Sequence, residues 1–237
     1  MSEQDESAHA GRLEVHRLDG FIDAAFAFAV SVMAIAGAEV PHSLHDLMLA
    51  LDRIPGFACS FATLMMFWHR HVRWRDRFRL HDATTIRLSL MLVFFALIFV
   101  YPLNMLFQAM FSSFYDAFTH TTLPNEPEIG SVRELKALFI CYALAYACMA
   151  GTLVLLYRHS LRHSSSMAAR QRIEARETYY IQCGSVAVAI LSLLITLVIP
   201  NINSGFWNSL PGMVYVLLTL VYGLAGRWSR RALAQVS

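Results

Sequence analysis

The chain has 237 residues, of which 57% are apolar and only 15% are charged, and its formal net charge is +2. Soluble domains carry about a quarter charged residues. The composition therefore excludes a soluble enzyme, a nucleic-acid-binding protein and a secreted disulfide-rich domain. The small net charge also gives no sign of an anionic polymer as partner. The high apolar and low charged fractions are typical of a polytopic α-helical membrane protein.

Six apolar stretches are long enough to cross a bilayer as helices, which takes about 20 residues each. They cover residues 20–38, 47–68, 88–111, 137–157, 179–200 and 206–226. Asp52 and Arg53 interrupt the second stretch, so its first turns could instead form an amphipathic helix at the membrane interface. We therefore expect an all-α fold with six transmembrane helices per subunit.

The flanking segments define three regions of the chain. Residues 1–16 are polar and are expected to be a disordered N-terminus. Residues 17–228 hold the six spans, and residues 229–237 form a short C-terminal tail. In the third span, Asn104 and Gln108 lie one turn apart on one face, where they could form interhelical hydrogen bonds or line an outer vestibule.

The basic residues predict the orientation in the membrane. With six spans, 16 of the 19 Lys and Arg residues fall on one side, in both termini and in the segments 69–87 and 158–178. Because cytoplasmic loops carry the excess of basic residues, both termini are expected to be cytoplasmic, in a multi-pass protein of the cell membrane. The Arg-rich loops are expected to contact anionic lipid headgroups.

The first span differs from a generic lipid-facing helix. It is rich in alanine, which allows close helix packing, and Asp23 lies about one turn inside it. An ionised carboxylate costs about 2.5–3.5 kcal/mol near the bilayer centre, so a hydrogen-bond partner is expected on a neighbouring span. Trp68, His69 and His71 at the end of the second span are candidates.

One face of the first span carries alternating small and large side chains at helical spacing. These residues are Ala24, Ala27, Phe28, Ser31 and Ile35. Ordinary packing between helices would explain this pattern without a functional role for the face.

Three segments resemble a known family. Arg17-x-x-x-Phe21-x-Asp23 resembles the signature Arg-x-x-x-Phe-Ser-Asp, which opens the first helix in the endosomal/lysosomal potassium-channel family and its prokaryotic homologues. Trp68 and His71 match the family's Trp-x-x-His pattern at the end of the second helix. The leucine-rich third span, which reaches Pro102, is similar to the family's third helix. The resemblance covers most of residues 12–110, and residues 111–237 agree in span count and little else.

This resemblance implies a potassium-permeable cation channel, built as a homotetramer with a central pore lined by the first helices and without a Thr-Val-Gly-Tyr-Gly filter. No such filter sequence occurs in this chain. By register, the apolar pore constriction falls on Phe28, Val32 and Ile35, and a hydroxyl layer falls on Ser31. A polar network that fixes the first helix falls on Arg17, Phe21, Asp23, Trp68 and His71. Potassium and other monovalent cations are the implied partners.

Two positions depart from the family pattern. Ile22 stands where the signature has Ser, so one hydroxyl of the network is missing. Phe28 stands where Ile or Leu is usual. Because hydrophobic constrictions gate by dewetting, four phenyl rings are expected to close the pore more tightly than aliphatic side chains.

The residues leave other functions open. A proton-coupled secondary transporter could use Asp23 and His71. Such transporters usually show internal repeats and broken helices near the midplane, whereas this sequence has no internal repeat and its first span has no proline. A membrane-embedded enzyme is not expected, because the spans offer no nucleophile–base arrangement and no metal-ligand spacing. No cofactor or metal is expected. A scaffold without conduction would explain the alanines but not Asp23.

Overall fold

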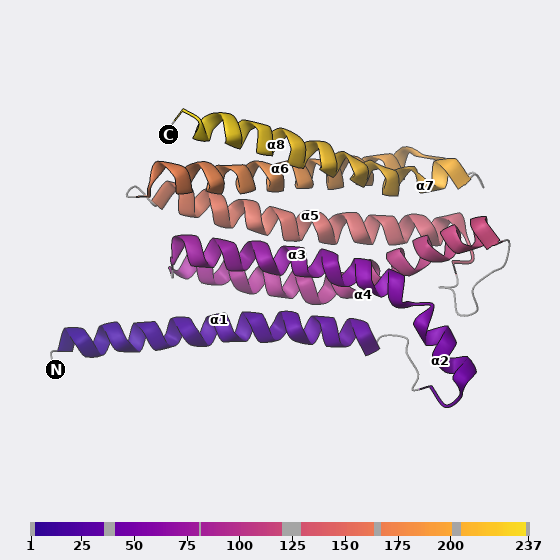
Figure 1. The fold of residues 1–237 in the computed structure, drawn as a ribbon, viewed down its shortest axis with the longest axis horizontal. Helices are drawn as coiled ribbons and strands as arrows, with labels where there is room; N and C mark the ends of the chain where they lie inside the picture. The colour runs from indigo at the N-terminus through magenta and orange to yellow at the C-terminus, as the bar shows by residue number, and fades with distance from the viewer. Residues whose placement is uncertain are drawn as a thin grey trace.

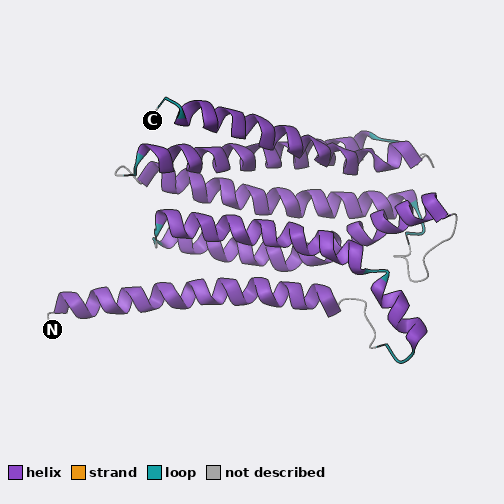
Figure 2. Ribbon diagram, viewed as in Figure 1, coloured by secondary structure: helices purple, strands orange, loops and turns teal. Residues whose placement is uncertain are grey.

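The computed structural model describes residues 3–35, 41–80, 82–119, 129–163, 167–200 and 205–235. Within these ranges the chain is helical apart from short turns, and it contains no strand (Figure 2). The elements are α1 (Glu3–Ile35), α2 (Leu44–Leu51), α3 (Ile54–Phe78), α4 (Ala83–Thr119), α5 (Val132–His163), α6 (Ala169–Val198), α7 (Gly205–Met213), a 3-10 turn η1 (Val214–Val216) and α8 (Leu217–Leu233). This confirms the expected all-α fold.

The helices form an elongated bundle with α1 at one edge and α8 at the other (Figure 1). Both ends of the chain lie at the same end of the bundle, together with the turn between α3 and α4. Among the described residues, five helices are long and apolar enough to cross a membrane, and a sixth span results if α2 and α3 together form one. The structure therefore describes a multi-pass membrane protein.

The second span is broken where the sequence interrupts it. The axes of α2 and α3 differ by 42°. A capping box of Ser43 and Asp46 starts α2, and Pro55 stands in the first turn of α3, where its missing N–H costs no hydrogen bond. The Gln108 side chain of α4 donates to the Arg53 carbonyl at the break, over 3.0 Å. This interhelical bond is one of the two roles expected for Gln108.

The backbone of the N-terminal segment is described from Glu3 onward. Residues 1–16 are expected to be disordered, whereas the backbone is helical from Glu3 and continues into the first span. The segment contains three Glu and two Ala residues, which are good helix formers. Extending a helix from an existing end also avoids the unfavourable nucleation step.

An aromatic cluster lies where α3, α4 and α5 pack together. The rings of Phe67 and Tyr146 meet edge to face with centroids 5.2 Å apart, and Phe99 contacts both. Tyr215 of η1 also meets Tyr146 edge to face, with centroids 5.3 Å apart. Such aromatic pairs add stability beyond the area they bury. The cluster joins α3, α4, α5 and η1, and α1 packs against α3 and α4.

A candidate pore helix and its polar anchor

One face of α1 has no cover within the subunit. Phe21, Phe28 and Ile35 expose 57%, 61% and 70% of their surface. The smaller members of the same face are exposed as well, and the whole exposed set is Arg17, Gly20, Phe21, Ala24, Ala27, Phe28, Ser31, Ala34 and Ile35. These positions recur at three- and four-residue intervals, so they form a single stripe along the helix. We call this set the α1 stripe.

The opposite face of α1 is packed into the bundle. Ile22, Phe26, Ala29 and Met33 are at most 2% exposed and belong to the core formed with α3 and α4. Val32 is only half-buried and packs against this core from the side. Three of the four predicted pore residues, Phe28, Ser31 and Ile35, therefore lie on the α1 stripe, whereas Val32 lies beside it.

Asp23 is held by two side chains of α3. The Trp68 indole donates from Nε1 to one carboxylate oxygen over 2.9 Å, and Arg75 donates to the other over 3.3 Å. Arg75 also lies 3.6 Å from Asp19, one turn earlier on α1. The carboxylate thus has a donor on each oxygen, which offsets the cost of placing its charge at the edge of the membrane.

Sequence reasoning places Trp68 next to Asp23 but misses Arg75. Arg75 follows Trp68 by seven residues, which is two helical turns, so both project from one face of α3. That spacing is the signal that could have identified it, once Trp68 was known to face the first helix.

The other predicted members of the network lie elsewhere. His71 is 1% exposed, and its Nε2 lies 3.0 Å from the Ser89 hydroxyl of α4 rather than at Asp23. Arg17 and Phe21 are exposed on the α1 stripe. The structure therefore joins two of the five predicted network residues by a direct hydrogen bond and supplies Arg75 as a third member.

A second tie runs from α3 to the far side of the bundle. Arg70 is 9% exposed and donates to the side-chain amide oxygen of Gln182 on α6 over 2.9 Å. It also donates to the Tyr222 hydroxyl of α8. Its guanidinium also lies over the Tyr222 ring, 5.2 Å from the centroid. A buried charge needs such partners. The same helix therefore holds α1 on one face and α6 and α8 on the other.

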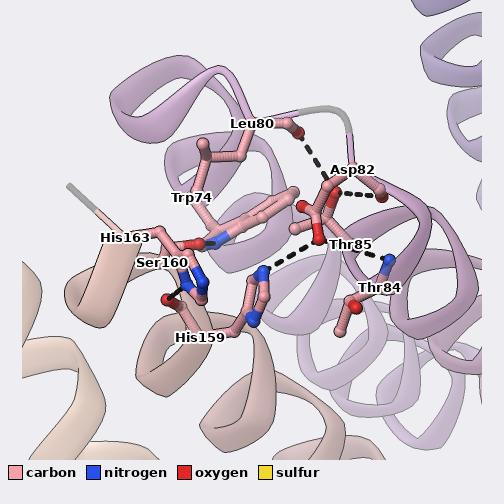
Figure 3. Close-up of polar contacts among 8 residues, drawn as sticks. All are labelled: Trp74, Leu80, Asp82, Thr84, Thr85, His159, Ser160 and His163. Carbon is pink, nitrogen blue, oxygen red and sulfur yellow. Dashed lines mark hydrogen bonds and ion pairs between the residues drawn. The ribbon is translucent and has the colours of Figure 1, made fainter.

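A third polar group lies at the end of the bundle that holds both termini. His159 of α5 points toward Asp82 at the start of α4, with Nε2 and the carboxylate 2.9 Å apart (Figure 3). Nearby, the Trp74 indole donates to the Ser160 hydroxyl over 2.9 Å. Burial raises the pKa of Asp82, but the Thr85 hydroxyl, His159 and the Thr84 amide outweigh it and hold that pKa below its ordinary value.

The described residues contain no cluster of three or more His, Cys, Asp or Glu side chains placed to hold a metal ion. Several polar side chains, among them Asp23, Arg70 and Asp82, instead tie one helix to another. The feature of this arrangement that is open to a ligand or to another copy is the α1 stripe. On it, large apolar side chains alternate with alanines and with the hydroxyl-bearing Ser31.

Comparison with known proteins agrees with this geometry. A family model described as "Endosomal/lysosomal potassium channel TMEM175" matches residues 17–102. A protein of Marivirga tractuosa described as a potassium channel is 26% identical over 224 residues, which cover 92% of this chain and 90% of that protein.

Among solved structures, the crystal structure of a variant of the potassium channel MtTMEM175, in complex with a nanobody–MBP fusion protein, superposes with a TM-score of 0.76. It is 25% identical and covers 91% of this chain and 93% of that one. The proteins so matched are potassium channels, not enzymes. The matches confirm the resemblance read from the first three spans, and they show that the chain is similar to the TMEM175 potassium channels.

Proposed function

We propose that the chain is a potassium-permeable cation channel in which four copies surround a central pore lined by α1. The observation that carries this proposal is the α1 stripe, an exposed face on a helix whose other face is locked into the bundle. Its alanines allow copies to approach closely. The anchor of Asp23 on Trp68 and Arg75 fixes the rotation of α1, so the same residues would face the axis in every copy.

The proposed constriction is the ring of Phe28 side chains, followed by Ile35 two turns further along the stripe. A narrow apolar ring excludes water and so gates by dewetting. Val32 is half-buried beside the stripe and would shape the wall between these rings. Exposed aromatic faces attract cations by about 0.5–1 kcal/mol, which favours cations over anions when the rings part.

Ser31 supplies the proposed hydroxyl layer between the apolar rings. Its hydroxyl donates to the Ala27 carbonyl of its own helix over 3.0 Å. The proton of the hydroxyl is therefore directed at the backbone, and the oxygen lone pairs are left to face the axis, where a cation could use them. With no Thr-Val-Gly-Tyr-Gly sequence in the chain, selectivity would depend on these rings and this layer.

The proposed orientation places both termini in the cytoplasm. Figure 1 supports this orientation, because both ends of the chain and the α3–α4 turn lie at one end of the bundle. The segments at this end carry most of the basic residues of the sequence. The arginines of segments 69–87 and 158–178 would then contact the anionic headgroups of the inner leaflet. Residues 17–228 form the channel domain in this proposal, with a short tail at 229–237.

Proton-coupled transport through Asp23 and His71 has less support. Asp23 is bonded to Trp68 and Arg75, while His71 is bonded to Ser89. A proton relay between Asp23 and His71 would require both residues to break these hydrogen bonds and form new ones.

Potassium flux into liposomes tests the proposal, with the native chain compared with Phe28→Ala. Widening the constriction is expected to raise the flux at least several-fold. The matched control is Phe94→Ala on α4, since Phe94 is exposed to a similar extent, 58% against 61%, but lies off the α1 stripe. Folded tetramers that pass neither potassium nor sodium in any variant would contradict the pore assignment, and equal effects of the two substitutions would contradict the role of Phe28.

A further inference from the structure

A small cavity lies between α1, α3 and α4 at the end of the bundle that holds both termini. Its polar lining comes from Asp19 of α1, His71 and Arg75 of α3, and Thr85 and Ser89 of α4, while Ile22 forms an apolar wall. The cavity has room for about one water molecule. A cavity of this size that is lined by polar groups holds water, whereas apolar cavities stay dry.

One nitrogen of the buried His71 ring has no protein partner among the described residues. Nε2 is bonded to Ser89, but Nδ1 is fully enclosed and makes no hydrogen bond. Leaving a buried ring nitrogen unpaired costs as much as losing a hydrogen bond. His71 lines the cavity, so the cavity adjoins the ring that carries this nitrogen.

A second pair of groups in the same cavity is too far apart for a direct bond. The Arg75 guanidinium and the Asp19 carboxylate lie 3.6 Å from each other, beyond the usual 2.7–3.2 Å of a hydrogen bond. Polar groups at such a distance are commonly bridged by water. Both residues line the cavity beside His71.

We infer that a single ordered water molecule binds in this cavity and joins α1 to α3. It donates one proton to His71 Nδ1 and the other to the Asp19 carboxylate, and it accepts from Arg75. These three bonds are the usual number for a buried water. The arrangement fixes the imidazole as the tautomer that carries its proton on Nε2 and donates to Ser89. The water thus adds a second tie to α1, one turn before Asp23.

The water also explains how the hydrogen bonds of His71 can be completed although the neighbouring α1 residue, Ile22, is apolar. Ile22 is 1% exposed and gives the cavity no hydrogen-bonding group. With the bound water, the hydrogen bonds around His71 come from solvent instead of from the α1 side chain at this position.

Solid-state NMR of the full chain in liposomes, with ¹⁵N-labelled histidine, tests the inference. The His71 signals are assigned by their loss in His71→Asn. The expected result is an unprotonated Nδ1 that receives polarisation rapidly from water. Asp19→Leu, which removes one partner of the water, should slow this transfer at least several-fold. Asp76→Leu is the matched control, because Asp76 also lies near Arg75 but is 69% exposed and outside the cavity.

A protonated Nδ1, or transfer as slow in the native chain as in Asp19→Leu, would overturn the inference. A structure of the native chain at a resolution that shows solvent gives a second, independent readout. Solvent density within hydrogen-bond distance of Nδ1 would support the bound water. An Nδ1 that contacts a side chain, or that faces no density, would reject it even if the variants fail to fold.

Discussion

At the scale of single residues, Asp23 depends most on Trp68. Trp68→Phe keeps the aromatic packing but removes the donor 2.9 Å from the carboxylate. Because bonds to charged groups are among the stronger ones, and because the Asp23 side chain is 40% exposed, we expect the free energy of unfolding to fall by about 1–2 kcal/mol. Thermal unfolding followed by fluorescence-detected gel filtration measures this change.

The control for Trp68→Phe is Trp207→Phe. Trp207 of α7 is 47% exposed and lies outside the anchor, so its replacement should leave the unfolding midpoint within error of the native value. Equal destabilisation by the two substitutions would show that the indole N–H of Trp68 contributes nothing specific.

Single residues also mark how far the sequence can predict this site. The pairing of Asp23 with the end of the second span follows from the cost of a carboxylate in a membrane. Val32 is expected at the pore only from the family register, and its half-buried place beside the α1 stripe depends on packing that helical spacing alone does not decide. The bond between His71 and Ser89 could not be predicted, because Ser89 lies on a third helix that sequence spacing does not connect to His71.

At the scale of helices, α6 and α8 pack tightly against each other at Gly184. A methyl group added there would lie 2.5 Å from a methyl of Val221, whose branched side chain has little freedom to move away. Gly184→Ala should therefore push the helices apart and lower stability by about 1–3 kcal/mol. The measurement is again the thermal unfolding midpoint of the purified protein.

Gly151→Ala serves as the comparison for Gly184→Ala. An added methyl at Gly151 of α5 meets no atom within 4 Å, and alanine favours helix formation by about 1 kcal/mol over glycine. This variant should be as stable as the native chain or slightly more so. Loss of stability in both variants would point to a general need for helix flexibility instead of close packing at Gly184.

The tie between Asp82 and His159 connects the start of α4 to the end of α5 and should depend on pH. The pKa of Asp82 is lowered in the folded chain, so its contribution is present above the ordinary value of 3.8 and is lost as the pH falls through the folded value. The contribution should be at most about 1 kcal/mol because the Asp82 side chain is 43% exposed.

Acid unfolding of the native chain and of Asp82→Asn measures this dependence. As the pH falls below about 3.8, the native chain should lose stability faster than the variant, because only the native chain has a carboxylate to protonate at this position. Asp116→Asn, an exposed carboxylate elsewhere on α4, should follow the native curve. Parallel curves for all three proteins would contradict the proposed role of the pair.

The helices themselves are the part that sequence predicts best. Apolar length locates the spans, and the charged pair Asp52 and Arg53 locates the break between α2 and α3. Helix ends are predicted less well, because several helices extend past the apolar segment by turns that no membrane constraint fixes. For example, α4 starts at Ala83 and ends at Thr119, although its apolar segment covers only 88–111.

At the scale of the whole molecule, the two faces of α1 lead to a prediction about assembly. In the first span only 22% of the residues in the most apolar window are buried within the subunit, against 56% for α5. A helix at the edge of a bundle can face lipid, but lipid contact gives no reason to anchor it through Asp23 and to expose an alanine-rich stripe. Close packing around a shared axis explains both features.

We therefore expect native mass spectrometry of the protein, released from detergent or nanodiscs, to show four copies of the 26.8 kDa chain. Ala24→Phe and Ala27→Phe should weaken the tetramer, because each adds a large ring at a small position on the α1 stripe. Ala147→Phe on α5, at a half-buried position packed against the core, is the control and should lower stability without changing the number of copies. A native chain that stays monomeric or dimeric would contradict the shared pore, whereas a tetramer that survives both stripe substitutions would place the axis along another helix.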